Sequence, residues 1–430
     1  MVEPLVITGM GVVTPYGVGP QVLWEKLLDG ESAIQALPSA ETAHVQCRVG
    51  GQYSSYQPEQ FLPLRVTRKL DRFSQFGLIA AQEALSDAGL TPGDLAGSVP
   101  EDAPAWKKSA QGRERVGIMV GNNLGGWEFA ERELRHLWHD GPREVSPYMA
   151  TAWFPAAVQG TISIQLGIKG IGRTFLCDRA SSAYALIHAA RCLQRGHASL
   201  MFAGGAEAPF SPYAALCYQT SQLMSHHQVY CPFDQEHDGL VAGEGAAFVI
   251  MERLSEAINR KAPIYAELAG WATTHDGASF AETASDGKLY ASAIERALEQ
   301  AALTPDHVDC VFAAGSAVPA EDASEVRAIH QALGSAARNV PVSAPKAAFG
   351  NLYGAATAVD VIIALLALQH KVIPPTLHLE HPVEDYDLPF VAQTPRPVEQ
   401  LDNVVVLARG FGGANAALVL RRWQPPEGGA

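Results

Sequence analysis

Short hydrophobic runs that end in glycine-rich turns recur along the chain and predict β-strands. They cover residues 5–9, 116–121, 200–205, 308–315 and 404–410. Runs of this kind are typical of strands buried on both faces of a sheet. Helical periods lie between them: Leu78, Ala81, Leu85 and Ala88 share one face before Gly89, and the same spacing returns over 294–301. The alternation predicts a layered α/β architecture.

The two helical segments stand in matching contexts, which indicates an internal duplication. AAQEALSDAGLTPGDL leads to the strand VGIMVGNN, and AIERALEQAALTPDHV leads to VFAAGS. We place the junction between 253 and 265 and predict two halves, 1–255 and 256–430. Residues 98–115 lack any period and predict an exposed excursion, and the end of the chain, QPPEGGA, predicts a frayed tail.

Composition and charge exclude several classes of function. Lys+Arg 31 against Asp+Glu 45 gives a net charge of -14, which argues against nucleic acid or an anionic membrane as the main partner. No run reaches the roughly 20 apolar residues of a membrane span, and the first residues lack a basic signal-peptide head, so we expect a cytoplasmic protein. The six cysteines are scattered without metal spacing. We predict no disulfide framework, no metal and no cofactor.

The segment RTFLCDRASSAYALIHAARCLQRG passes from a strand through a polar corner into a helix. This is the geometry of a nucleophile elbow. The corner, the GEG after PFDQEHDGLVAGEG, the stretch VSAPKAAFGNLYGAA and the final GFGGAN together resemble the β-ketoacyl synthase family of the thiolase superfamily. The resemblance implies a thiolase-like α/β fold, in which two fused pseudo-duplicated halves form a five-layered α/β/α/β/α core.

The residues that the family needs for condensation are absent from the matching positions. The resemblance places Arg179 where the acyl-carrying Cys belongs, and Ala314 and Asn351 where the two catalytic His belong. Lys346 and Phe411 are retained; the position of Phe411 supplies a backbone oxyanion donor in active relatives. Because a guanidinium stays protonated, Arg179 cannot carry a thioester, and we expect no condensation by this chain alone.

The sequence alone leaves two possible environments for Arg179. A cation is unfavourable at a helix N-terminus. Arg179 is therefore expected either to pair with a carboxylate or to point away as a surface or interface residue. The candidate partners, which the sequence does not rank, are Asp178, Glu244, Asp322 and Glu325. Lys346 is expected to be a structural ion-pair residue, and Asn351 to hydrogen-bond locally.

Residues 125–154, GGWEFAERELRHLWHDGPREVSPYMATAWF, resemble the chain-length factors, the ketosynthase β subunits of type II polyketide synthases. Arg179 departs from the Gln that many of them carry. The resemblance implies a heterodimer with an active ketosynthase α subunit, supplied by an acyl carrier protein, in which a tunnel along the interface holds the polyketide chain. Its gating positions correspond to Trp127, Ala130 and Leu134, which spacings of three and four place on one helical face.

The residues are also compatible with two other functions. The chain could be an active acyltransferase or malonyl decarboxylase that uses Cys177 or another pocket group; we favour Cys177 as a packed strand residue. It could also be a homodimeric pseudoenzyme that binds an acyl ligand. The aromatic residues Trp127, Phe129, Trp138, Trp153 and Phe154 have a simpler interpretation as core or dimer interface.

Overall fold

The computed structural model describes residues 3–38, 45–96, 114–279 and 283–424. The predicted excursion over 98–115 lies almost wholly outside the described residues, and so does the tail beyond 424.

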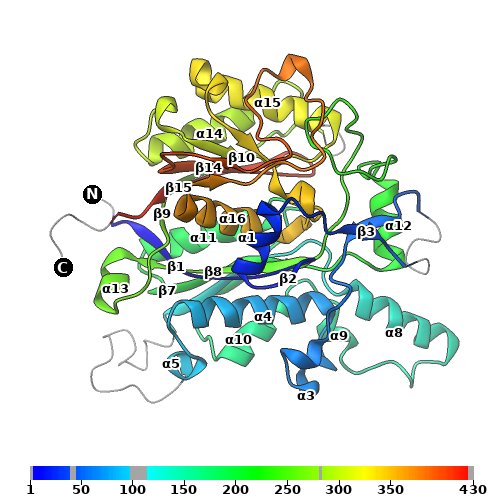
Figure 1. Ribbon diagram of the computed structural model, residues 1–430. Coiled ribbons are helices and arrows are strands. Elements are labelled where there is room, and N and C mark those ends of the chain that lie inside the picture. Colours follow the sequence, from blue (N-terminus) through cyan, green and yellow to red (C-terminus); the bar gives the residue numbers. More distant parts are fainter. Residues whose placement is uncertain (1–2, 39–44, 97–113, 280–282, 425–430) are drawn as a thin grey trace.

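Five layers are stacked in the molecule, as predicted, with helices between and outside two layers of strands (Figure 1). The uppermost layer in this view holds α14 (Lys288–Gln300) and α15 (Pro319–Leu333). The strands beneath it are β9 (Ala266–His275), β10 (Cys310–Phe312), β11 (Val342–Ser343), β14 (Asn403–Gly410) and β15 (Ala414–Arg422). The central helices are α1 (Pro20–Leu28), α11 (Ser181–Gln194) and α16 (Ala356–His370). The second layer of strands holds β1 (Leu5–Thr14), β5 (Val116–Gly121), β6 (Gly172–Phe175), β7 (Leu200–Glu207) and β8 (Gly245–Arg253). The lowest layer holds α4 (Arg72–Asp87) and α10 (Ala157–Leu166).

The two strand layers form one hydrogen-bonded sheet because β1 and β9 meet. The strand order is β11-β10-β14-β15-β9-β1-β8-β7-β5-β6. The link is narrow, since β1 and β9 pair only at Val6 with Glu267 and Ile7 with Ala266. Each half contributes its own mixed set of parallel and antiparallel strands on either side of this link. At the far end, β6 lies at the edge of the sheet.

The predicted helix at 78–88 is confirmed and begins earlier, at Arg72. The Asp71 carboxylate caps it by accepting a hydrogen bond from the backbone N–H of Phe73. Leu78, Ala81 and Leu85 are buried beneath the sheet, as their spacing requires. Gly89 ends the helix with φ +69°, a conformation that glycine adopts without strain.

The middle layer contains an exceptionally apolar helix. Residues Tyr353–His370 are long and apolar enough to cross a membrane, but 89% of this window is buried inside the protein. The segment therefore acts as a core helix, packed between the two strand layers.

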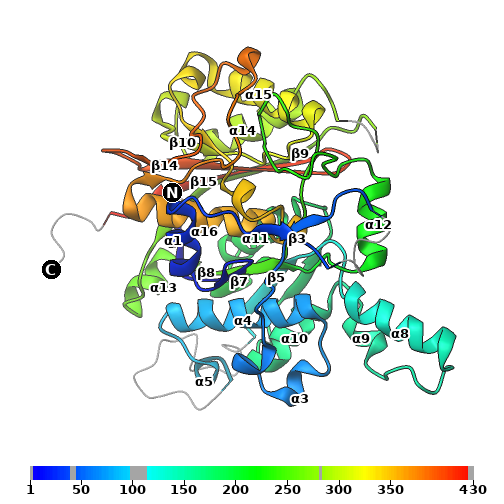
Figure 2. The same cartoon turned by 45° about the vertical axis from the view of Figure 1, so that its right-hand side comes forward.

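Shorter elements cover the surface around these layers. On the side that Figure 2 brings forward, α8 (Trp127–His139), α9 (Met149–Ala152) and α12 (Pro212–Thr220) extend beyond the layers. The remaining α-helices and strands are α3 (Leu64–Thr67), α5 (Pro92–Ala96), α13 (Leu254–Asn259), β2 (Gly17–Val18), β3 (Ile34–Ala36), β4 (Val49–Gly51), β12 (Val372–Ile373) and β13 (Arg396–Pro397).

Candidate functional site

The predicted nucleophile elbow lies between β6 and α11, at residues 176–181. Its backbone turns at Asp178, which has φ +51°, a left-handed value that Asp tolerates better than most residues. The Ser181 hydroxyl fixes the turn by donating to the Asp178 carbonyl at 2.6 Å and accepting from the Cys177 N–H at 2.8 Å. Gly410, at the end of β14, allows close approach, since a Cβ there would lie 2.2 Å from the Cys177 carbonyl oxygen.

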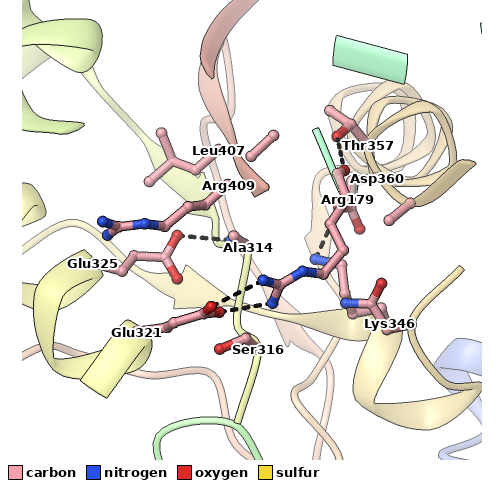
Figure 3. A pocket seen from close by; sticks show the side chains of 13 residues that line it. Arg179, Ala314, Ser316, Glu321, Glu325, Lys346, Thr357, Asp360, Leu407 and Arg409 are labelled. Carbon is pink, nitrogen blue, oxygen red and sulfur yellow. Dashed lines mark hydrogen bonds and ion pairs between the residues drawn. The ribbon is translucent and has the colours of Figure 1, made fainter. Parts of the chain in front are cut away.

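Arg179 is buried at the elbow, with 4% of its surface exposed (Figure 3). Its guanidinium donates two parallel hydrogen bonds to the Glu321 carboxylate, at 2.7 and 2.9 Å, and a third to Asp178 at 3.0 Å. The prediction of a carboxylate partner is therefore confirmed for Asp178. The surface interpretation is wrong, and the main partner, Glu321 on α15, is one that the sequence did not suggest.

The charges of this pair are mutually stabilised. Burial opposes the charge on Arg179, but the Glu321 and Asp178 carboxylates raise the guanidinium pKa well above its ordinary value. Burial also opposes ionisation of Glu321, yet the nearby Arg179 holds the pKa of this carboxyl below its ordinary value. Both groups stay charged at any working pH, so the elbow holds a fixed ion pair.

The other predicted carboxylate partners of Arg179 have different roles. Glu244 pairs with Arg72 at 2.6 Å. Asp322 accepts from backbone N–H groups that follow β10 and lies 3.0 Å from His237. Glu325 accepts from two further N–H groups of that segment. Glu244, Asp322 and Glu325 are therefore not partners of Arg179. Each of these carboxylates is engaged by other hydrogen-bond donors.

The two positions expected to match the catalytic His of the family make structural hydrogen bonds. The Ala314 N–H donates to Glu325 at 2.7 Å. The Asn351 amide oxygen accepts from the Tyr353 N–H at 2.9 Å, which is the local hydrogen bond predicted for it. Its NH₂ group also donates to the Tyr230 hydroxyl at 3.1 Å, across 121 residues of sequence. Neither a methyl group nor a neutral amide can act as a general base at these two positions.

Lys346 makes the ion pair that the sequence suggested. Its ammonium lies 2.8 Å from the Asp360 carboxylate and donates to the Ala313 carbonyl at 2.7 Å. Both side chains are 3% exposed. Burial raises the pKa of Asp360, while the Lys346 charge acts in the opposite direction. Lys346 thus ties α16 to the end of β10.

Phe411 is the position expected to supply an oxyanion donor, and its backbone N–H is already engaged within the chain. The Phe411 N–H donates to the Asp178 carboxylate at 2.8 Å, and the same carboxylate oxygen accepts from Arg179. An oxyanion would have to displace a full negative charge from this donor. The donor is therefore not free to stabilise a reaction intermediate.

The cavity beside the elbow is too small for an acyl chain. About 20 Å³ remains open between Arg179, Glu321, Lys346 and their neighbours, which is room for about one water molecule. Figure 3 shows that charged side chains from the elbow, α15, α16 and β14 converge on this space.

Cys177 was expected to pack within the strand, but β6 ends at Phe175, and Cys177 lies in the elbow, half-buried against the central core. Burial, with a smaller effect from the neighbouring Asp178 charge, raises the pKa of its thiol. A raised pKa leaves less reactive thiolate at neutral pH. This environment argues against Cys177 as the nucleophile of an acyltransferase.

The three predicted tunnel residues lie together on α8, with two different environments. Trp127 is half-buried and its ring packs on Tyr213 of α12, with centroids 4.5 Å apart. Leu134 is also half-buried, whereas Ala130 is 1% exposed and faces the body of the protein. The wider aromatic set is no single cluster, since Phe129 is 3% and Trp138 81% exposed.

Sequence reasoning missed two residues that organise this region. Glu321 had a weak signal, because α15 begins with the acidic pattern AEDASE, but nothing in it distinguishes the first acid from the others. Asn123 had none. It lies between β5 and α8 and donates to both Asp178 and the Tyr218 hydroxyl.

Comparison with known proteins places this geometry in a family. The model of the β-ketoacyl synthase N-terminal domain matches residues 2–257, and that of the C-terminal domain matches residues 265–380. The chain is 36% identical to the tetracenomycin polyketide synthase ketoacyl synthase beta subunit of Streptomyces glaucescens, over 97% of this chain and 98% of that protein. It is 31% identical to the 3-oxoacyl-(acyl-carrier-protein) synthase 2 of Synechocystis sp., over 98% of both chains.

A solved structure agrees with the sequence relatives. The ishigamide ketosynthase/chain length factor superposes with a TM-score of 0.87 at 25% identity, covering 99% of this chain and 100% of that one. The thiolase-like ketosynthase fold expected from the motifs is thereby confirmed. With family models over most of its length and a named β subunit among its relatives, the chain belongs to the β-ketoacyl synthase family, in the ketosynthase β-subunit or chain-length-factor branch.

Proposed function

We propose that this chain is the non-condensing, chain-length-determining subunit of a type II polyketide synthase heterodimer. The observation that carries the proposal is the buried ion pair between Arg179 and Glu321 at the elbow. It occupies the place where condensing relatives hold the acyl chain, and the space beside it admits about one water molecule. An active ketosynthase α subunit then has to supply the nucleophile.

One face of the molecule supports a protein partner. The edge strand β6 has no neighbour on its outer side among the described residues, and its first two residues are exposed. Large apolar side chains are exposed nearby: Leu176 at the end of this strand is 56% and Ile164 on α10 is 78% exposed. Unpaired strand edges with adjoining apolar surface are typical of interfaces. We assign this face to the ketosynthase α subunit.

We place the end of the polyketide chain at α8. In this proposal the poly-β-keto chain extends from the nucleophile of the partner along the interface, past Ala130 and Leu134, until Trp127 blocks it. The contact between Trp127 and Tyr213 holds the indole against α12. Substrate reaches the partner on an acyl carrier protein; nucleic acid, membrane and cofactors have no part in this function.

The partner is tested first, by native mass spectrometry of the protein purified gently from its own cells. A one-to-one complex with a second chain of similar mass that has a reactive Cys is the expected result. A stable homodimer without such a partner would refute the proposal and favour an acyl-binding pseudoenzyme.

The tunnel is tested by Trp127→Ala in the intact complex. Removing the indole should lengthen the product by one or more two-carbon units, because the volume that the indole fills on α8 becomes free. Trp138→Ala is the matched control: it removes an indole from the same helix, but that indole is 81% exposed and lies away from Tyr213. Product lengths that are identical in wild type and Trp127→Ala would refute the tunnel assignment.

A further inference from the structure

A short polar bridge joins the elbow to the segment that leads into α8. Asn123 is its centre. Its side-chain amide donates to the Asp178 carboxylate at 3.3 Å and to the Tyr218 hydroxyl of α12 at 2.8 Å. One half-buried side chain therefore connects the elbow with α12, four residues before α8 begins.

Glu207 holds the backbone of the segment that contains Asn123. The Glu207 carboxylate, at the end of β7 and fully buried, accepts from the N–H groups of Asn123 at 2.8 Å and Leu124 at 3.2 Å. It also accepts from the Gly354 N–H at 3.2 Å, so the segment is tied to the start of the apolar core helix. Because its backbone cannot shift without breaking these bonds, Asn123 holds its side chain at a set distance from α12.

Helices α8 and α12 themselves meet at the protein surface. There Trp127 packs on Tyr213, and the Glu131 carboxylate accepts from the Tyr213 N–H at 3.0 Å. The contact between Asn123 and Tyr218 is the inner of the two. Tyr218 is itself held by stacking on Tyr353, with ring centroids 4.1 Å apart. These two contacts therefore join α12 to α8, and to the segment that leads into it, at an inner and an outer point.

We propose that Asn123 is a positioning residue for product length: it sets the separation of α8 from α12 and thereby the room beside Trp127. It does so without touching the polyketide chain. The inference rests on the proposed function, since it needs the chain to pass α8. In this proposal the elbow has a structural role, because Asp178 anchors the bridge through its hydrogen bond with Asn123.

The test uses three substitutions in the intact complex. Asn123→Ala removes both bonds. Asn123→Asp is nearly isosteric, but it loses both donors and places a carboxylate opposite Asp178. Tyr218→Phe is the mildest, because it removes one acceptor and keeps the ring that stacks on Tyr353. Asn339→Ala, at an exposed asparagine after α15, is the control.

Two readouts are measured for each variant: amide hydrogen exchange in peptides that cover α8 and α12, and the distribution of product lengths. Loss of the bridge should raise exchange in both helices about three- to tenfold, the factor expected for one net hydrogen bond. It should also at least double the fraction of products with altered length. Tyr218→Phe should show part of both effects and Asn339→Ala neither.

The outcomes separate this inference from the function on which it rests. If Trp127→Ala changes product length but the Asn123 variants do not, the positioning role is refuted and the tunnel stands. Faster exchange at unchanged length also refutes it. If Trp127→Ala itself has no effect, the tunnel assignment fails and the positioning role fails with it.

Discussion

The ion pair at the elbow makes a quantitative prediction about stability. Arg179→Met removes the guanidinium and leaves the Glu321 carboxylate, which is 8% exposed, without its main cation. Breaking a buried pair by removing one partner typically costs about 3–5 kcal/mol, because a desolvated charge remains. Replacing both partners by apolar residues of similar volume is often neutral or stabilising. Arg179→Met combined with Glu321→Met should therefore recover most of the loss.

The expected change in melting temperature follows from chain length. An unfolding entropy of about 2.1 cal/mol/K per residue gives about 0.9 kcal/mol/K for a 430-residue chain. A loss of about 4 kcal/mol then lowers the melting temperature by about 4 °C. The Arg409 guanidinium on the far side of the cavity acts on Glu321 more weakly, so it reduces this loss without removing it.

The assay is differential scanning fluorimetry of the wild type, the two single variants and the double variant, at one protein concentration and in one assembly state. The double-variant cycle gives the coupling between the two side chains. Arg338→Met is a control, because its pair with Asp387 is exposed and should change stability by less than about 1 kcal/mol. A single Arg179→Met variant as stable as the wild type would refute the account of a buried, uncompensated charge.

Three other predictions follow from the same site. Arg179→Cys should gain no acyl-enzyme with a thioester-mimic inhibitor, because Asp178 occupies the Phe411 N–H; acylation detected by mass spectrometry would contradict this. Lys346→Met should destabilise the protein by about 3–5 kcal/mol, because Asp360 then stays buried without its cation, and a loss below 1 kcal/mol in thermal unfolding would show that the pair is not essential. Burial raises the pKa of Glu207 to about 8. The folded state therefore keeps this proton at a higher pH than the unfolded chain does, and stability should fall between about pH 4.5 and 8, by at most about 1.4 kcal/mol per pH unit. Glu207→Gln should flatten this dependence in melts at pH 6 and 8, and an unchanged slope would exclude Glu207 as its source.

Much of the fold could be predicted because its signals are local. The run over 116–121 and the strand Val116–Gly121 coincide, and a glycine follows the helix that ends at Asp87, where its left-handed φ is needed. The run over 308–315 was misjudged in length. Its strand is only Cys310–Phe312, because the N–H groups of Ala314 and Gly315 donate to Glu325 and leave the strand ladder. A carboxylate on a later helix ended the strand, and no pattern within the run contains that information.

The site was predictable only where it depends on motif positions. The motifs located Arg179 at the elbow, and its charge made a carboxylate partner one of the two environments expected for it. They could not select Glu321, which is 142 residues away in sequence, because the choice depends on how α15 approaches the elbow. Asn123 shows the same limit: its partners lie on an elbow and a helix that only the folded chain brings together.

The geometry also implies that one substitution would not give this elbow condensing activity. A Cys at position 179 would leave Glu321 without its main cation, with no imidazole at position 314 or 351 to activate the thiol. Asp178 would still accept from the Phe411 N–H, and it would still hold Asn123. Freeing the oxyanion donor therefore requires a change at Asp178, and that change removes the anchor of the bridge to α8. If Asn123 positions α8 as we propose, a restored pocket would alter product length. In the function that we propose, catalysis and length control would compete for one carboxylate, and dividing them between two subunits would remove the conflict.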